Sequence, residues 1–215
     1  MNNVVRACSE AFFARKVIVC EGKTEVGICR AMDSYLGEID NHVMSYYGCV
    51  AIEGNGSTFA KYSKSFKDLG FEILTFCDSD RGCSPSKDEL SNNRIELCDC
   101  EEGNSIEKQV FKDLPYSTIK EIVDYVIKEK YDSDENSFIA SAKANNTAFP
   151  DNWKEYDDNG LVRKTLANLS AVKEWFKRID RGEELGKIIF RYFKNLSDET
   201  HLKQQLNQII RWVKS

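Results

Sequence analysis

The sequence predicts an α/β protein with a parallel β-sheet covered by helices on both faces, followed by a small helical subdomain. Three observations support this fold class. Short apolar runs alternate with segments of helical spacing through the first half of the chain, which is typical of βαβ units. The first and third runs are continuous, as strands covered on both faces require. The remainder of the chain is mostly helical in pattern.

The first unit is a strand, a tight turn and a helix. Residues 17–20 form a short apolar run, which residues 21–24 break. From Glu25 onward, apolar side chains recur at helical spacing as far as Leu36.

The next unit has a similar order. A second strand region is expected within residues 43–52, and Ser57 or Thr58 is expected to cap a helix that Gly70 ends. Residues 71–77 are again apolar and rich in β-branched or aromatic side chains, which predicts the third strand.

Weaker signals follow the third strand. Residues 81–93 are polar and predict a loop, and residues 94–98 predict a fourth strand. Ser105 is expected to cap a short helix. Thr118 and Glu121 have the spacing of a capping box ahead of a further helix.

The last part of the chain predicts helices only. Residues 145–160 are irregular, and two or three amphipathic helices are expected from Leu161 onward. The last of them carries one apolar face, formed by Leu202, Leu206, Ile209, Ile210 and Val213. We therefore expect a first domain at residues 1–115 and a helical subdomain at residues 116–215 that packs on it.

Length and composition favour a soluble globular protein. The chain has 215 residues, of which 41% are hydrophobic and 30% charged, and this is ordinary for a folded domain with a proper core. No apolar run approaches the roughly 20 residues that span a bilayer, and residues 1–15 lack a signal-peptide core. A cytoplasmic protein with eight reduced cysteines is expected. Cys98 and Cys100 form a close pair, but a structural zinc site needs a second one.

Acidic residues follow two of the predicted strands. Glu21 ends the first strand, with Glu25 one helical turn later, and Asp78 and Asp80 end the third. Ligands bind at the carboxyl ends of parallel strands, and a further acid, Glu107, follows the fourth strand. Acids that meet at one edge repel each other unless hard divalent cations bind between them.

Each acidic motif alone also fits a simpler interpretation. Asp and Glu are common in turns and at helix starts, so neither Glu21 with Glu25 nor Asp78 with Asp80 is specific by itself. An acid that ends one apolar strand combined with a D-x-D that ends another is less easily produced by chance.

The net charge of −5 is unusual for a simple nucleic-acid binder, which carries a basic patch. Bound cations would neutralise an acidic cluster and remove this objection. Basic residues also gather late in the chain, at Lys173, Lys177, Arg178, Arg181, Lys187, Arg191 and Lys194.

These motifs resemble a known family. Residues 12–25, FFARKVIVCEGKTE, are similar to the opening of the Toprim domain in the overcoming-lysogenization-defect (OLD) family of ATP-dependent nucleases. Asp78-Ser79-Asp80 matches the second Toprim signature, and Ser105-Ile106-Glu107 looks like the third acidic element. Lys177 lies where this family tends to carry a functional lysine in its helical tail. The alternative for Lys177 is an ordinary lysine on a helix surface.

The resemblance implies a Toprim (Rossmann-like) fold and a DNA endonuclease that uses two Mg²⁺ or Mn²⁺ ions. Two adjacent ions can activate water and stabilise both the attacking and the leaving oxygen. Glu21 and Asp78 would be catalytic, and Lys177 would stabilise the negative charge at phosphorus. The expected metal-binding residues are Glu21, Glu25, Asp78, Asp80 and Glu107, with Ser105 assisting.

The sequence departs from the family in one respect. Family members carry an ATPase domain, but no Walker A sequence appears, since Gly22-Lys23-Thr24 has Val17 where the upstream glycine is needed. We expect a C-terminal fragment, or a stand-alone version that works with a separate ATPase. A role in phage defence follows by family analogy only, and a homo-oligomer is left open.

Two other functions compete with the nuclease. A primase or topoisomerase fragment would need a zinc or template-binding part or a nucleophilic tyrosine domain, and nothing clearly supplies either. A non-catalytic Toprim module for nucleic-acid binding or protein assembly is the second alternative. The intact set of acids argues against it, because a degenerate copy would be expected to lose some of them.

Overall fold

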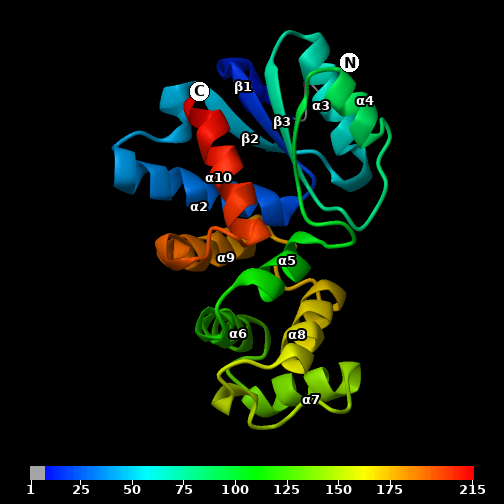
Figure 1. Ribbon diagram of the computed structural model, residues 1–215, viewed down its shortest axis with the longest axis vertical. Helices are drawn as coiled ribbons and strands as arrows, with labels where there is room; N and C mark the ends of the chain where they lie inside the picture. Colours follow the sequence, from blue (N-terminus) through cyan, green and yellow to red (C-terminus); the bar gives the residue numbers. More distant parts are fainter. Residues whose placement is uncertain (1–7) are drawn as a thin grey trace.

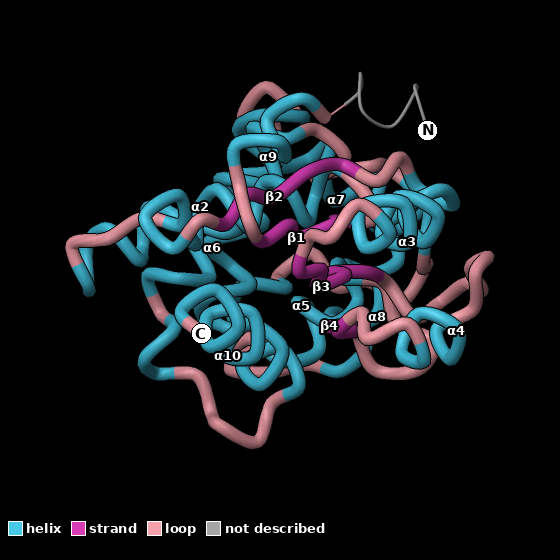
Figure 2. Tube along the Cα trace, turned by 90° about the horizontal axis from the view of Figure 1, so that it is seen from above, coloured by secondary structure: helices cyan, strands magenta, loops and turns pink. Residues whose placement is uncertain are grey.

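The computed structural model describes residues 8–215, so the first seven residues of the predicted 1–115 domain lie outside it. Its centre is a four-stranded parallel sheet in the order β2-β1-β3-β4 (Figure 1, Figure 2). The strands are β1 (Lys16–Cys20), β2 (Cys49–Glu53), β3 (Glu72–Cys77) and β4 (Glu96–Asp99). The parallel sheet predicted from the apolar runs is confirmed.

One face of the sheet is covered by helices from both ends of the chain. Side chains alternate across a strand, and Ile18 and Cys20 of β1 point into the larger hydrophobic core. This face packs against α2 (Lys23–Asp40) and α10 (His201–Lys214), and α9 (Ile179–Arg191) packs on α2. Thus the last two helices return to this part of the molecule, with α10 beside the sheet and α9 against α2 (Figure 1).

The opposite face has its own smaller core. Val17 and Val19 of β1 pack there with Phe59 and Phe66 of α3 (Phe59–Asp68) and with Leu90 of α4 (Lys87–Asn92). Helices therefore cover both faces of the sheet, as predicted.

The middle of the chain forms a helical layer beyond one end of the sheet (Figure 1). It contains α5 (Ile106–Asp113), α6 (Tyr116–Lys130), α7 (Glu135–Asn145) and α8 (Gly160–Val172). Short 3-10 turns lie at Ser9–Phe13 (η1), Met44–Tyr47 (η2), Gly56–Thr58 (η3), Trp153–Glu155 (η4) and Phe193–Asn195 (η5).

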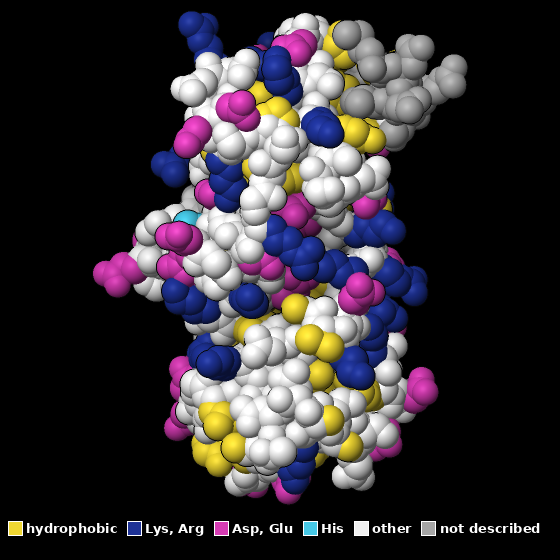
Figure 3. Space-filling view, turned by 90° about the vertical axis from the view of Figure 1, so that its right-hand side faces the viewer, with side chains coloured by type: hydrophobic (Ala, Val, Ile, Leu, Met, Phe, Trp, Pro, Cys, Tyr) yellow, Lys and Arg dark blue, Asp and Glu magenta, His cyan; other side chains and the backbone are white. Residues whose placement is uncertain are grey.

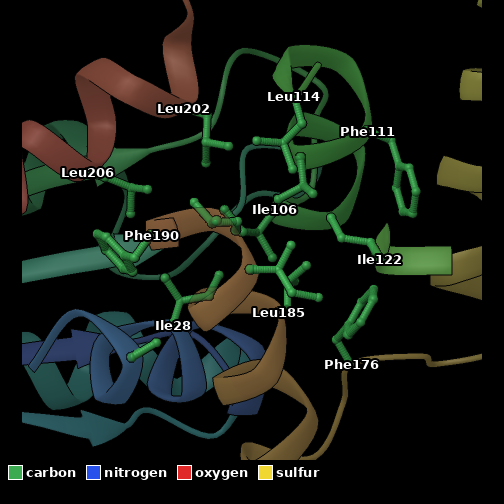
Figure 4. Close-up of a cluster of buried hydrophobic side chains, with 14 of the residues drawn as sticks. Ile28, Ile106, Phe111, Leu114, Ile122, Phe176, Leu185, Phe190, Leu202 and Leu206 are labelled. Carbon is green, nitrogen blue, oxygen red and sulfur yellow. The ribbon is translucent and has the colours of Figure 1, made fainter. Parts of the chain in front are cut away.

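The larger core runs without interruption from the sheet into this helical layer. Figure 4 shows side chains of α2, α5, α6, α9 and α10 meeting in one cluster, with Ile106 of α5 and Leu185 of α9 near its centre. Burial of this apolar surface fixes α5 and the segment before α9 relative to the strand ends.

Four local predictions were wrong or only partly right. The expected loop at 81–93 contains α4, because Ser86 accepts a hydrogen bond from the Glu89 amide and Glu89 accepts one from the Ser86 amide, a capping box that the sequence offered. The expected strand region at 43–52 is a strand only in its second part, since η2 precedes β2.

The other errors concern helix starts. Thr58 is the N-cap residue of α3, but its side chain does not cap the helix, because its hydroxyl instead donates to the Gly54 carbonyl at 2.6 Å. The capping box expected at Thr118 is also wrong, because α6 begins at Tyr116, directly after Pro115. Proline fixes φ near its helical value and suits a helix start. No helix among residues 8–215 is long and apolar enough to cross a membrane.

Candidate metal and nucleic-acid site

A cleft of about 470 Å³ lies at the carboxyl ends of β1, β2 and β3. It is bordered by the start of α5 and by the segment that joins α8 to α9. All of the sequence-predicted site residues line it, namely Glu21, Glu25, Asp78, Asp80, Ser105, Glu107 and Lys177. We call it the acidic cleft. Figure 3 shows acidic and basic side chains side by side across the middle of one face of the molecule.

Glu21 and Asp78 meet directly. They follow β1 and β3, which are neighbours in the sheet with Cys20 opposite Phe76. The Glu21 Oε2 atom accepts a hydrogen bond from the Asp78 backbone amide at 2.9 Å. The Asp78 Oδ1 atom in turn accepts one from the Ile106 amide at 2.7 Å, so Asp78 ties the end of β3 to the N-terminus of α5.

Glu25 lies in the first turn of α2 with only 1% of its surface exposed. Its Oε2 atom accepts a hydrogen bond from the Gly22 amide at 2.9 Å, which fixes the turn between β1 and α2. Asp80 differs from the other acids because it is exposed at the rim of the cleft.

Ser105 and Glu107 enter from α5. The Ser105 hydroxyl caps this helix by accepting a hydrogen bond from the Lys108 amide at 3.4 Å. Glu107 is 1% exposed. Its Oε1 atom lies 3.2 Å from the Thr24 hydroxyl and 3.2 Å from the Lys177 Nζ, whereas its Oε2 atom is buried without a hydrogen-bond partner.

Lys177 lies between two helices, not on one. It follows the buried Trp175 and Phe176 and precedes Arg178, the N-cap residue of α9. Its side chain is 38% exposed and forms an ion pair with Glu107. Lys177 therefore lies in a connecting segment and not on a helix surface, and its side chain lines the cleft.

Burial and mutual repulsion perturb the charges of the cleft. Burial, with the nearby charges of Asp78 and Glu107, raises the pKa of Glu25 to about 8. Burial, with Glu107 and Glu21, raises the pKa of Asp78 to about 7. For Lys177, burial lowers the pKa, but Glu107, Glu25 and Asp78 together raise it above its ordinary value. The cleft thus has an excess of buried negative charge that added cations would relieve.

The donor set fits a hard divalent cation, since it consists of carboxylate and hydroxyl oxygens, and one buried oxygen of Glu107 has no partner. In the described residues, however, no three His, Cys, Asp or Glu side chains converge as a group that could hold a metal ion. The carboxylates of Glu21, Glu25 and Asp78 are bonded to backbone amides. Joint ligation therefore requires side chains to turn from these partners.

Sequence reasoning missed several residues of the cleft. Glu53 ends β2 and lies opposite Cys20 in the register with β1, so the rule that placed Glu21 at the strand edge also applies to it. Lys23, Arg81 and Lys108 add positive charge to the lining. No local pattern distinguished these three cations from other surface residues.

Residues 12–80 match the family model for the overcoming lysogenization defect protein-like TOPRIM domain. This segment is thus similar to an OLD-like Toprim domain. No match to the chain was found among curated proteins or among solved structures.

The Toprim match agrees with the fold and indicates a general function. A four-stranded parallel sheet with helices on both faces is consistent with the Toprim α/β fold. A Toprim domain indicates a metal-binding function on nucleic acids, typically that of a nuclease or primase. Glu21, Glu25, Asp78 and Asp80 fall within the match, while Ser105, Glu107 and Lys177 lie beyond it and reach the cleft through the packing described above.

Proposed function

We propose that this protein is a divalent-metal-dependent nuclease that cuts phosphodiester bonds of DNA. The observation that supports this most strongly is the convergence of Glu21, Asp78, Glu107 and Lys177, distant in sequence, in one cleft beside Glu25. A nuclease needs such a set, because the phosphodiester and its transition state carry strong negative charge. Metal ions held by the acids, together with the lysine, would stabilise that charge.

The proposed cofactors are two Mg²⁺ or Mn²⁺ ions. Bound there, they would supply an activated water and stabilise the attacking and leaving oxygens. The residues proposed to hold them are Glu21, Glu25, Asp78, Asp80 and Glu107, with Ser105 assisting. The unpartnered Oε2 atom of Glu107 and the raised pKa values of Glu25 and Asp78 support this role, because each marks negative charge that lacks a sufficient counterion.

The cations of the cleft have a different proposed task. Lys177 forms an ion pair with Glu107. A phosphate bound to a metal ion on Glu107 would therefore lie near the Lys177 ammonium, which would stabilise the negative charge that develops at phosphorus. Lys23, Arg81 and Lys108 line the same cleft and would hold the flanking phosphates of the DNA backbone.

The partners and setting rest on the family resemblance. We propose that an ATPase domain or subunit works with this nuclease, that the pair acts in phage defence, and that it does so in the cytoplasm. All eight cysteines are free thiols in the structure, which suits a reducing compartment.

Plasmid nicking with Mg²⁺, with Mn²⁺ or with EDTA tests the function. We expect the plasmid to be cut only when a divalent metal is present. The cleavage rate of Asp78→Ala should be lower by about 100-fold or more. Asp68→Ala, which removes an exposed carboxylate paired with Lys64 on α3, is the matched control and should cut normally. Absence of cutting with any metal, together with metal-independent binding of DNA or protein, would establish the non-catalytic Toprim module instead.

A further inference from the structure

Thr24 connects three separate parts of the cleft. It lies in the first turn of α2, and its side chain is completely buried. Its hydroxyl is 3.2 Å from the Glu107 Oε1 atom on α5 and 3.1 Å from the Phe176 carbonyl oxygen, which are 83 and 152 residues away in the chain. Neither contact could be inferred from a local sequence pattern.

Both acceptors of the Thr24 hydroxyl are next to Lys177, one in space and one in the chain. Glu107 Oε1 is itself 3.2 Å from the Lys177 Nζ, and Phe176 is the residue directly before Lys177. A hydroxyl has a single hydrogen to donate, so the two acceptors share it. The Thr24 hydroxyl thus contacts both the Glu107 carboxylate and the backbone next to Lys177.

The backbone around Thr24 leaves little freedom for these contacts to shift. A Cβ placed on Gly182 of α9 would lie 2.8 Å from the Thr24 carbonyl oxygen, and one on Gly27 would lie 2.4 Å from the Gly182 carbonyl carbon. The starts of α2 and α9 therefore touch backbone to backbone. The backbone that carries the Thr24 hydroxyl is part of this close contact.

We propose that Thr24 is a positioning residue that sets the distance between Glu107 and Lys177. It orients the Glu107 carboxylate through Oε1, leaving Oε2 for a cation, and it fixes the backbone from which Lys177 reaches the phosphate. Loss of the hydroxyl leaves both groups present but misaligned. This inference rests on the proposed nuclease function.

The test compares Thr24→Val, which keeps the shape and removes the hydroxyl, with Thr24→Ser, which keeps the hydroxyl. Because small misplacements of catalytic groups are costly, we expect kcat of Thr24→Val to fall by about 100-fold while KM changes by no more than about twofold. Thr24→Ser should restore most of the rate. Thr165→Val is the matched control and should keep full activity, because it removes a buried hydroxyl away from the cleft that donates to the Leu161 carbonyl and accepts from the Asn146 side chain.

A second measurement does not depend on cleavage. Hydrogen–deuterium exchange at the amides of residues 175–178 should be faster in Thr24→Val and unchanged in Thr165→Val. If Thr24→Val fails to fold, Thr24→Ala must show the same loss of kcat and the same faster exchange.

The outcomes separate the two proposals. A wild-type protein that cuts DNA beside a Thr24→Val variant that cuts equally fast would overturn the positioning role and leave the nuclease intact. A wild-type protein that cuts nothing would overturn the nuclease. In that case unchanged exchange at residues 175–178 in Thr24→Val would also overturn the structural role of Thr24.

Discussion

Four acids of the acidic cleft, Glu21, Glu25, Asp78 and Glu107, are each held by a specific partner. Glu21 and Glu25 accept hydrogen bonds from backbone amides, and the buried Glu107 pairs with Lys177. A buried charge without such a partner is strongly unfavourable. Backbone amides and one lysine therefore partly compensate the negative charge of these acids.

Replacing Lys177 tests its proposed role at the phosphate. Lys177→Met should keep metal binding, because the carboxylates remain and a cation competing for Glu107 is removed. Cleavage should fall by about 100- to 1,000-fold, since a fixed charge at the developing oxyanion is lost. Calorimetric titration with Mn²⁺ and single-turnover cleavage measure the two effects. Lys173→Met, an exposed lysine of the same segment, is the control, and unchanged cleavage in Lys177→Met would remove this lysine from the mechanism.

At the scale of elements, the close contact of α2 with α9 places the Lys177 segment beside the Toprim acids. Three glycines make this contact possible, at positions 27, 182 and 186. A Cβ on Gly186 would lie 2.6 Å from the Ala31 Cβ, and one on Gly27 would lie 2.5 Å from the Ile179 carbonyl oxygen. Glycine within a helix normally lowers its stability. Here the close packing of α2 against α9, which only glycine allows, compensates for that cost.

Gly27→Ala should separate the two helices. The added methyl meets backbone atoms that cannot rotate away, and overpacking of this kind costs about 1–3 kcal/mol or more of unfolding free energy. We expect a lower melting temperature and, because α9 moves with the Lys177 segment, a lower kcat as well. Gly160→Ala is the control, since a Cβ there meets nothing within 4 Å, and it should be neutral or slightly stabilising. Equal melting temperatures for the two variants would contradict the close contact.

How far the sequence predicted the molecule depended on the range of each interaction. Apolar runs ending in Glu21 and in Asp78 predicted both the strands and the cleft, because parallel strands bring their carboxyl ends to one edge of a sheet. Lys177 required the family resemblance, since its neighbours in the fold are far away in sequence. The roles of Thr24 and Gly27 were missed because each depends on contacts with residues beyond 106 in the chain, and no local pattern records such contacts.

At the scale of the whole molecule, the acids that suit cation binding also lower the stability of the metal-free protein. The chain carries a net charge of −5, and several of its acids face one another in the cleft. An acid with a higher pKa in the folded than in the unfolded chain binds its proton more tightly when folded. Stability is then lost as the pH rises from the unfolded to the folded value.

Glu25 and Asp78 set the pH range of this effect. Its window runs from the ordinary value of 4.5 to about 8 for Glu25 and from 3.8 to about 7 for Asp78. In EDTA, the melting temperature should therefore fall between about pH 5 and pH 8. Glu25→Gln should flatten this dependence, because its side chain stays neutral throughout, whereas Glu38→Gln, an exposed control on the same helix, should keep the wild-type slope.

Metal should reverse this loss of stability. A cation that binds only the folded cleft stabilises it in proportion to the logarithm of its concentration over Kd, and protons compete with it for the carboxylates. Added Mg²⁺ should therefore raise the melting temperature of the wild type more at about pH 8 than at about pH 6, and should raise that of Glu25→Gln less. Differential scanning fluorimetry at both pH values measures these shifts. A melting temperature that rises with pH in EDTA, or that Mg²⁺ leaves unchanged at the higher pH, would contradict the picture of mutually repelling acids that a divalent ion relieves.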